Sequence, residues 1–252
     1  MTSYNPFSLE GKRILVTGAS SGIGRATAIE CSRMGATVIL TARNEQRLQE
    51  TLSQMTEPAK HQIVVADLGT EDGLLSVVNA VSEPLNGVVH SAGFTIPKPF
   101  QFVTAKDMDA IMDVNYKAPA LLTQKLLKGK KISKGASIVF ISSISGVWVS
   151  YIAGSLYSGS KGAVNGLVKG MAIELAAKQI RVNCVNPGMI ETAILENGVI
   201  TEEQLQEDAK RYPLGRYGKP EEVAHAVIYL LSDAASWVTG SNLLIDGGYT
   251  LL

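Results

Sequence analysis

Short apolar runs recur along this chain, and a longer stretch with helical spacing separates each run from the next. Most of the runs are apolar almost throughout, which is typical of strands buried on both faces of a parallel sheet. The alternation predicts βαβ units with right-handed crossovers, and hence an α/β fold in which a doubly wound parallel sheet lies between two layers of helices. The expected strands cover residues 13–18, 37–42, 61–67, 86–92, 136–143, 180–187 and 242–247. The expected helices cover residues 23–34, 44–56, 71–82, 104–127, 157–178, 202–211 and 220–232.

We expect a single domain over residues 1–252, because this length suits one large α/β unit and no Pro- or Ser-rich linker divides it. The longest departure from strand–helix alternation is segment 188–219. An insertion between two core elements is where a substrate lid would lie. The alternative is a surface helical excursion without a role.

Charge and cysteine content exclude several classes of protein. Lys and Arg together number 23, as do Asp and Glu, so the chain lacks the basic excess of a general nucleic-acid binder. Cys31 and Cys184 have no metal-ligand spacing and are expected to be buried free thiols, so no metal site is predicted. No run approaches the roughly 18 apolar residues of a membrane span, and no signal peptide is apparent. We expect a cytoplasmic protein without a membrane contact.

The first expected strand runs directly into TGASSGIGRATA, which places Gly18, Gly22 and Gly24 at a strand-to-helix junction. Glycines there allow a tight turn and a close approach of the backbone to a pyrophosphate, which the helix N-terminus attracts. Ser20 and Ser21 add hydroxyl donors. The motif therefore predicts a dinucleotide site, and the alternative is a glycine-rich turn without a ligand.

The end of the second expected strand indicates which dinucleotide binds. A carboxylate there would hold a ribose 2′-hydroxyl, but the chain has Ala42 followed by Arg43. A guanidinium can pair with a 2′-phosphate, so NADP(H) is predicted over NAD(H). Asp67, at the end of the third expected strand, is placed to meet the adenine amino group or, alternatively, to cap a helix.

Tyr157 and Lys161 lie four residues apart, and so on one face of an expected helix. A neighbouring ammonium favours phenolate, so we expect Lys161 to lower the pKa of Tyr157 and make it a usable general acid/base. Ser143 ends the fifth expected strand in ISSISG, where its hydroxyl can donate to a carbonyl oxygen. Together these residues predict a reaction site.

Six motifs carry a resemblance to the classical branch of the short-chain dehydrogenase/reductase family, which spans essentially the whole chain. They are TGASSGIG, HSAG (90–93), VNYKAP, YSGSK, NPGMIET (186–192) and LLIDGGYT. The resemblance implies a Rossmann-like fold and a catalytic tetrad of Ser143, Tyr157, Lys161 and Asn115. It also implies that Lys161 binds the nicotinamide ribose and that Asn115 helps to hold a water leading toward Lys161.

The resemblance further implies that the backbone at Ile190 and the hydroxyl of Thr192 hold the nicotinamide carboxamide. The complete set of expected cofactor contacts is Gly18, Ser20, Ser21, Gly22, Ile23, Gly24, Arg43, Asp67, Leu68, Ala92, Gly93, Tyr157, Lys161, Pro187, Gly188, Ile190 and Thr192.

Three features depart from the family's pattern. HSAG replaces both asparagines of the usual motif, so His90 and Ser91 must support the central strand differently, and His90 is expected to be structural rather than catalytic. Ser143 lies fourteen residues before Tyr157, where the family commonly has thirteen, which leaves Ser142 and Ser145 as alternative donors. The stretch before Tyr157, residues 148–156, is rich in bulky side chains.

Residues expected to line the substrate pocket are Ser145, Trp148 and Tyr151, although both aromatic side chains could merely pack.

Within the family, the overall pattern is most similar to 3-oxoacyl-[acyl-carrier-protein] reductases, including PLGRYGKPEEVAHAVIYLLSD (213–233). This implies NADP(H)-dependent interconversion of a ketone and a secondary alcohol, with an acyl thioester as one substrate and fatty acid biosynthesis as one setting. An acidic acyl carrier protein would meet basic residues outside the active-site mouth, and the alternative is a solvated charge run. The candidate basic residues are Lys128, Lys130, Lys131, Lys134 and Lys178.

Two other functions stay open at this point. One is an NAD(P)-dependent dehydrogenase of a sugar, steroid or other secondary alcohol, and the other is a regulator that senses NADP(H) without turnover. The family also implies a homotetramer, with a dimer as the alternative, in which helices 104–127 and 157–178 pair with their copies.

Overall fold

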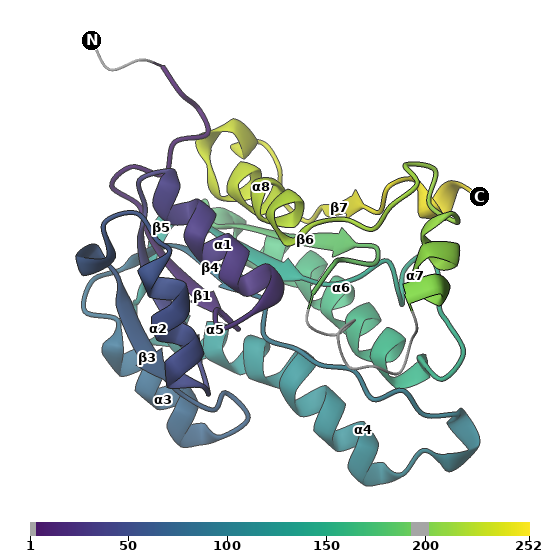
Figure 1. The fold of residues 1–252 in the computed structure, drawn as a ribbon. Coiled ribbons are helices and arrows are strands. Elements are labelled where there is room, and N and C mark those ends of the chain that lie inside the picture. The colour runs from purple at the N-terminus through teal and green to yellow at the C-terminus, as the bar shows by residue number, and fades with distance from the viewer. Residues whose placement is uncertain (1–3, 193–201) are drawn as a thin grey trace.

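The computed structural model describes residues 4–192 and 202–252 and shows one sheet with helices on both faces (Figure 1). Its strands are all parallel and lie in the order β3-β2-β1-β4-β5-β6-β7. The strands are β1 (Arg13–Thr17), β2 (Thr37–Ala42), β3 (Gln62–Val65), β4 (Leu85–His90), β5 (Ile132–Ile141), β6 (Arg181–Pro187) and β7 (Asn242–Ile245). The helices are α1 (Gly22–Arg33), α2 (Glu45–Ser53), α3 (Glu71–Ala80), α4 (Ala105–Met112), α5 (Ala118–Lys128), α6 (Ser155–Leu175), α7 (Glu202–Ala209) and α8 (Pro220–Leu231). The predicted Rossmann-like, doubly wound fold is confirmed.

Two hydrophobic cores flank the sheet, as its apolar strands require. One core joins the sheet to α3, α5 and α6 through residues such as Val77, Leu122 and Val168. The other joins it to α1, α2 and α8 through residues such as Leu48 and Val227. The molecule therefore has three layers, with the strand ends free to carry function at the two edges of the sheet.

The expected helix over 104–127 is present but contains one irregular turn. A π-helical turn, η3 (Asp113–Lys117), joins α4 to α5 without a break. Thr104 begins α4 with a capping box, since its side chain accepts from the Asp107 N–H and the Asp107 side chain accepts from the Thr104 N–H. π-turns of this kind are frequent at functional sites, and this one holds Asn115.

Strand β5 begins at Ile132, earlier than the expected start at residue 136. Lys134 and Gly135 interrupt the apolar pattern there, and the register with β4 shifts between Leu85 and Gly87. The periodicity therefore indicated only the buried half of this strand. Its ten residues carry the chain from one edge of the sheet to the other.

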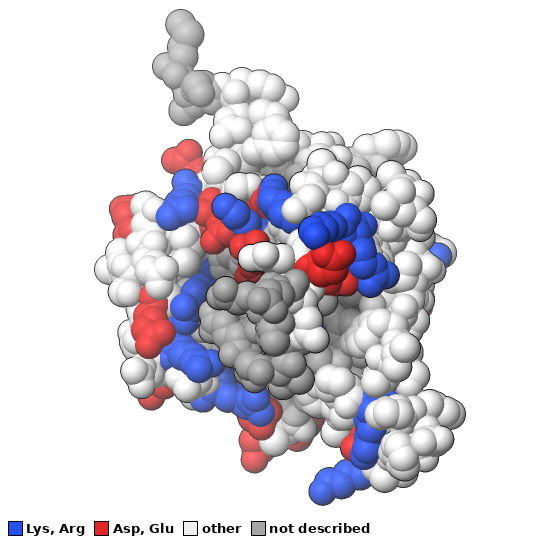
Figure 2. All heavy atoms as spheres, turned by 45° about the vertical axis from the view of Figure 1, so that its right-hand side comes forward, with Lys and Arg blue, Asp and Glu red and all other residues white. Residues whose placement is uncertain are grey.

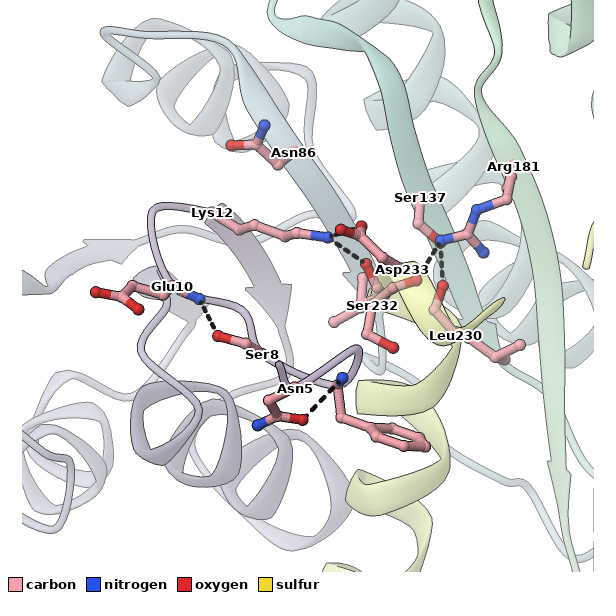
Figure 3. A network of polar contacts seen from close by, with 12 residues as sticks. Asn5, Ser8, Glu10, Lys12, Asn86, Ser137, Arg181, Leu230, Ser232 and Asp233 are labelled. Carbon is pink, nitrogen blue, oxygen red and sulfur yellow. Dashed lines mark hydrogen bonds and ion pairs between the residues drawn. The ribbon is translucent and has the colours of Figure 1, made fainter. Parts of the chain in front are cut away.

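The amino-terminal ends of the strands meet the end of α8 at one edge of the sheet (Figure 3). Lys12 donates to Asp233 Oδ1 at 2.6 Å and lies 3.4 Å from the Leu231 carbonyl oxygen. Arg181 donates to the Ser232 carbonyl oxygen at 3.1 Å. These cations satisfy the terminal carbonyls of α8 and complement its dipole, while a cavity of about 360 Å³ opens beside them.

Basic and acidic side chains lie next to one another over much of the face drawn in Figure 2. Within residues 4–192 and 202–252, no helix is both long enough and apolar enough to cross a membrane. The same residues contain no group of three or more His, Cys, Asp or Glu side chains that could hold a metal ion.

Candidate active site

The glycine-rich turn after β1 is packed so closely that side chains would not fit. Gly18 has φ +67°, and a Cβ there would lie 2.8 Å from the Ala92 nitrogen, while a Cβ on Gly24 would clash with the Gly18 carbonyl. Gly22, with φ +51°, would place a Cβ 3.2 Å from Thr192 Cγ2. The turn therefore lies against the loop after β4 and the segment after β6, as a shared nucleotide site at the switch between β1 and β4 requires.

The first turn of α1 keeps its anion-binding capacity. Ser21 is the N-cap residue, but its side chain makes no capping hydrogen bond. The Ser20 carbonyl oxygen accepts a hydrogen bond from Arg25, and the Ser20 hydroxyl takes no part in that contact. The N–H groups at this end are therefore not masked by a side-chain cap, so a pyrophosphate fits here by chemistry as well as by space.

Arg43 and Asp67 follow β2 and β3 at the same edge, and both are exposed. Arg43 forms no hydrogen bond or ion pair with the described part of the chain. Asp67 accepts from the Gly69 N–H at 3.0 Å, whereas α3 is capped by Thr70, which accepts from the Gly73 N–H at 3.1 Å. The alternative of a helix cap at Asp67 is therefore wrong.

The loop after β4 shows how HSAG replaces the family's asparagines. The Thr17 hydroxyl accepts from the N–H groups of Ser91 at 3.1 Å and Ala92 at 3.3 Å. His90 lies 2.7 Å from Thr123 Oγ1, which itself donates to the Pro119 carbonyl, so the imidazole must be the donor in that pair. Burial lowers the pKa of His90 to about 3, so the ring is neutral. His90 is a structural residue, as the sequence predicted.

Asn115 ties the loop after β4 to α6. Its Oδ1 accepts from the Phe94 N–H at 3.0 Å, and its Nδ2 donates to the Phe94 carbonyl and to Ser160 Oγ. A Cβ on Gly93 would lie 3.1 Å from Asn115 Oδ1 and 3.6 Å from Lys161 Nζ. Asn115, Gly93 and Lys161 are thus brought together from three elements.

The Lys161 ammonium is buried without an acidic partner among the described residues. It donates to the Ile141 carbonyl oxygen at 2.8 Å and lies 5.6 Å from the centroid of the Tyr157 ring. Burial lowers the pKa of Lys161 from 10.5 to about 8. Such a placement is costly, because the contacts described for the ammonium are one carbonyl and one ring face rather than a carboxylate.

The expectation that Lys161 lowers the pKa of Tyr157 is wrong for the polypeptide alone. Burial raises the pKa of Tyr157 to about 12, and a hydrogen bond with Ser143 opposes that rise. The ammonium lies over the ring and is directed at Ile141 rather than at the phenol oxygen. Desolvation therefore outweighs the neighbouring charge.

The three serines after β5 differ in what they contact. Ser143 lies against the Tyr157 phenol, and its Oγ accepts from the Ser145 N–H at 3.1 Å. Ser142 Oγ instead donates to the Lys161 carbonyl at 3.2 Å. Ser143 is therefore the serine whose hydroxyl the fold directs toward Tyr157.

Two aromatic side chains flank this group on a loop before α6. Trp148 and Tyr151 are 42% and 47% exposed. The Tyr151 hydroxyl lies 3.2 Å from Thr95 Oγ1, and its ring covers Gly154, where a Cβ would be 2.6 Å from Tyr151 Cζ. Thr95 was not predicted, because it lies in a loop without any motif.

The segment after β6 is anchored near the turn at α1. The Met189 N–H donates to the Tyr212 hydroxyl at 3.2 Å, and the Glu191 N–H donates to the Gly218 carbonyl at 2.9 Å. Ile190 is buried. Sequence reasoning missed Tyr212 as an anchor, and the central part of the expected lid, 193–201, lies outside the described residues.

The candidate lysines for a carrier protein do not surround the site mouth. Lys128, Lys130 and Lys134 precede or open β5, at the amino-terminal edge of the sheet, and Lys178 precedes β6. A ten-residue strand at about 3.3 Å per residue separates this edge from Ser143 by roughly 30 Å. Lys131 is also engaged, since its ammonium donates to the Val81 carbonyl at 2.6 Å. The expected placement beside the active site is wrong.

Comparisons with known proteins agree with this geometry. The profile of a family described as "Enoyl-(Acyl carrier protein) reductase" matches residues 18–250. A tropinone reductase homologue of Arabidopsis thaliana is 38% identical over 256 residues, which cover 100% of this chain and 79% of that protein. The 3-oxoacyl-[acyl-carrier-protein] reductase of Thermotoga maritima is 36% identical over 247 residues, 96% of this chain and 99% of that protein.

Among solved structures, a Beutenbergia cavernae protein named as an NAD(P)-dependent gluconate 5-dehydrogenase, with bound NADP, matches with a TM-score of 0.89. Its sequence is 32% identical, and the match covers 98% of this chain and 100% of that one. With the fold, the nucleotide turn and the Tyr157–Lys161 pair in place, the chain belongs to the classical short-chain dehydrogenase/reductase family of oxidoreductases.

Proposed function

We propose that this chain is an NADP(H)-dependent oxidoreductase that interconverts a ketone and a secondary alcohol. One observation carries the proposal: the Lys161 ammonium is buried over the Tyr157 ring, without an acidic partner among the described residues. Unpaired buried charges are costly, and they concentrate at functional sites.

The proposed chemistry assigns one task to each residue of the tetrad. Ser143 donates a hydrogen bond to the substrate carbonyl oxygen, and Tyr157 delivers a proton to it. Because burial raises the pKa of Tyr157 to about 12, the phenol is protonated at neutral pH, which is the form that reduction needs. Lys161 stabilises the phenolate that remains, and Asn115 fixes the loop beside it. A bound nicotinamide supplies the hydride.

The residues around the nucleotide turn support NADP(H) as the cofactor. The close-packed glycines make room for a pyrophosphate at α1, and Arg43 is an unpaired cation within the described structure at the end of β2. The remaining predicted contacts, from Ile23 and Leu68 to Pro187 and Gly188, belong to the same proposal.

The substrate is proposed to be a small or medium ketone that packs against Trp148 and Tyr151, close to Ser145. Relatives named as tropinone reductase homologues, a 3-oxoacyl reductase and a gluconate dehydrogenase all fit a ketone–alcohol pair. A 3-oxoacyl thioester stays in this class, although docking of a carrier protein on the expected lysines has lost its support.

Three further features are proposals of the same kind. Segment 188–219 would act as a substrate lid hinged on the anchored residues Ile190 and Gly218. A homotetramer and a cytoplasmic location stay predictions. One Arabidopsis relative is described as chloroplastic.

The test is oxidation of NADPH and of NADH, followed in parallel against cyclic ketones, oxidised sugar acids and a 3-oxoacyl thioester. Turnover with NADPH preferred over NADH is expected with at least one ketone. Binding of NADPH without turnover of any of them would favour the sensing regulator, and equal use of NADH would overturn the role of Arg43.

A further inference from the structure

A buried polar network lies directly beneath the candidate tetrad. Asn165, one turn after Lys161 in α6, donates from Nδ2 to Ser142 Oγ at 2.8 Å and to the Lys161 carbonyl at 2.7 Å. Asn186 in β6 donates from Nδ2 to Asn165 Oδ1 at 3.0 Å and to the Ser143 carbonyl at 2.8 Å. The network thus joins α6, β6 and the end of β5.

The directions of these hydrogen bonds are fixed by their partners. Each Nδ2 has two hydrogens, and both are used in Asn165 and in Asn186. A flipped Asn165 amide would turn its oxygen toward the Lys161 carbonyl and its NH₂ toward the NH₂ of Asn186. The arrangement therefore has a single orientation, which makes it a rigid strut rather than an adaptable filler.

Both ends of the strut hold main-chain atoms of tetrad residues. At one end, Asn165 donates a hydrogen bond to the Lys161 carbonyl, and at the other end, Asn186 donates one to the Ser143 carbonyl. The three side chains of the network, those of Ser142, Asn165 and Asn186, are buried, so water cannot easily replace a lost contact. Asn165 is the link, because it alone touches both the Lys161 carbonyl and the side chain of Asn186.

The network is not optimised for stability alone. Asn186 Oδ1 is buried without a hydrogen-bond partner in the described structure. Such an acceptor costs free energy, and an apolar packing of the same space would avoid that cost. Retaining two amides here is explained if the distance between the Ser143 and Lys161 main chains matters.

We propose that Asn165 is a positioning residue that sets the Ser143 and Lys161 backbones relative to each other for proton transfer. The inference rests on the proposed function, since it assigns Asn165 to the same tetrad. Displacements of about 1 Å at a reaction site cost up to 10²-fold in rate, whereas cofactor binding at the glycine turn does not involve Asn165.

The experiment compares Asn165→Ala and the similarly branched Asn165→Leu with Asn183→Ala. Asn183 is a matched control, because it is buried in the same strand as Asn186 and makes two hydrogen bonds to residues 238 and 241, away from the tetrad. Either Asn165 variant should lower kcat on the order of 10- to 100-fold, with KM for the ketone and Kd for NADPH nearly unchanged. Asn183→Ala should lose stability but keep kcat within about twofold.

Equal losses of kcat in Asn165→Ala and Asn183→Ala would overturn the proposal, as would an unchanged kcat in a folded Asn165 variant. If the wild type turns over no ketone, the proposed function fails, and the strut is judged by NMR titration of the Lys161 side chain in the cofactor-free protein. Asn165→Leu should then change the pKa of the Lys161 ammonium by about 0.5 or more. An unchanged pKa would overturn the positioning role of Asn165 as well.

Discussion

Both edges of the sheet hold basic side chains: Lys12 and Arg181 are half-buried at the amino-terminal edge, and Lys161 is buried at the carboxyl edge. At the amino-terminal edge, Lys12 has an acidic partner, Asp233 at 2.6 Å, and Arg181 donates to a carbonyl at the end of α8. At the carboxyl edge, Lys161 is more deeply buried, and its contacts among the described residues are the Ile141 carbonyl and the Tyr157 ring. Both edges are polar, but among the described Lys and Arg side chains only Lys161 is buried, and it has no acidic partner there.

This difference separates anchoring from chemistry. Cations at the end of α8 complement the helix dipole and donate to its terminal carbonyl groups, so their charge stabilises the helix end. A buried ammonium without a carboxylate partner among the described residues is an arrangement that is common at functional sites, where it can stabilise a negative charge formed beside it. The proposed reaction site therefore lies at the carboxyl edge, opposite the cavity beside Lys12 and Arg181.

The largest expected effect comes from Tyr157→Phe. Removing the phenol hydroxyl removes the proposed proton donor, so turnover should fall by about 10²- to 10⁴-fold. Binding of NADPH should persist, because the glycine turn is intact. Steady-state NADPH oxidation and a fluorescence titration check both points.

Tyr229→Phe is the matched control for this change, since Tyr229 lies in α8 away from the tetrad. It should keep wild-type turnover. Full activity in Tyr157→Phe would show that Tyr157 is not the proton donor. The contrast between a structural edge and a reactive edge would then fail.

The next effect is the pH dependence of stability that a buried lysine imposes. Because burial lowers the pKa of Lys161 from 10.5 to about 8, the unfolded chain binds more protons than the folded protein across that window. The free energy of unfolding contributed by Lys161 should therefore rise with pH from about 8 to 10.5, by up to about 3 kcal/mol.

Denaturant unfolding of the cofactor-free wild type and of Lys161→Met at several pH values isolates this contribution. Other buried groups, such as Cys31, titrate in both proteins and cancel in the difference, whereas Cys184, whose pKa the Lys161 charge lowers, adds to it. A difference that stays flat from pH 8 to 10.5 would show that Lys161 is not desolvated as described.

A smaller effect is expected for Arg43→Ala. Losing a charge-assisted contact to a 2′-phosphate costs about 1.5–3 kcal/mol, so Kd for NADPH should rise by roughly 10- to 100-fold while Kd for NADH changes little. Isothermal titration with both nucleotides measures this. Arg33→Ala, at the far end of α1, serves as the control, and equal weakening of both nucleotides by Arg43→Ala would argue against NADP specificity.

The smallest effect is expected at the amino-terminal edge. Lys12→Met removes an ion pair whose acidic partner, Asp233, is 82% exposed, so stability should fall by less than about 1 kcal/mol and turnover should not change. Chemical denaturation at low and high salt would check this. A large loss of turnover would mean that this edge is not merely an anchor.

The sequence predicted the sheet well, and it predicted which candidate site residues lie at one edge, where local pattern decides the outcome. Apolar runs indicated each of the seven strands of the sheet, and the Gly18–Gly24 turn and the Tyr157–Lys161 pair lie at the same edge of it, as predicted. The physical reason is that strand order and helix periodicity bring such motifs together in a parallel α/β fold.

Features that depend on long-range packing could not be predicted. The position of the lysines before β5 required the true start of that strand at Ile132, which Lys134 and Gly135 obscured. The raised pKa of Tyr157 depends on burial by distant segments. The strut through Asn165 depends on Asn186, 21 residues further along the chain, and no motif connects the two.

The most direct test of this account is the stability and turnover of Lys161→Met, measured on the same preparation at pH 7. The account predicts a variant no less stable than the wild type, because a costly buried charge is gone, and one that has lost ketone-dependent NADPH oxidation. A variant that is clearly less stable and loses turnover only in proportion to its unfolded fraction would show that Lys161 is an anchor like Lys12. That result would contradict the central claim.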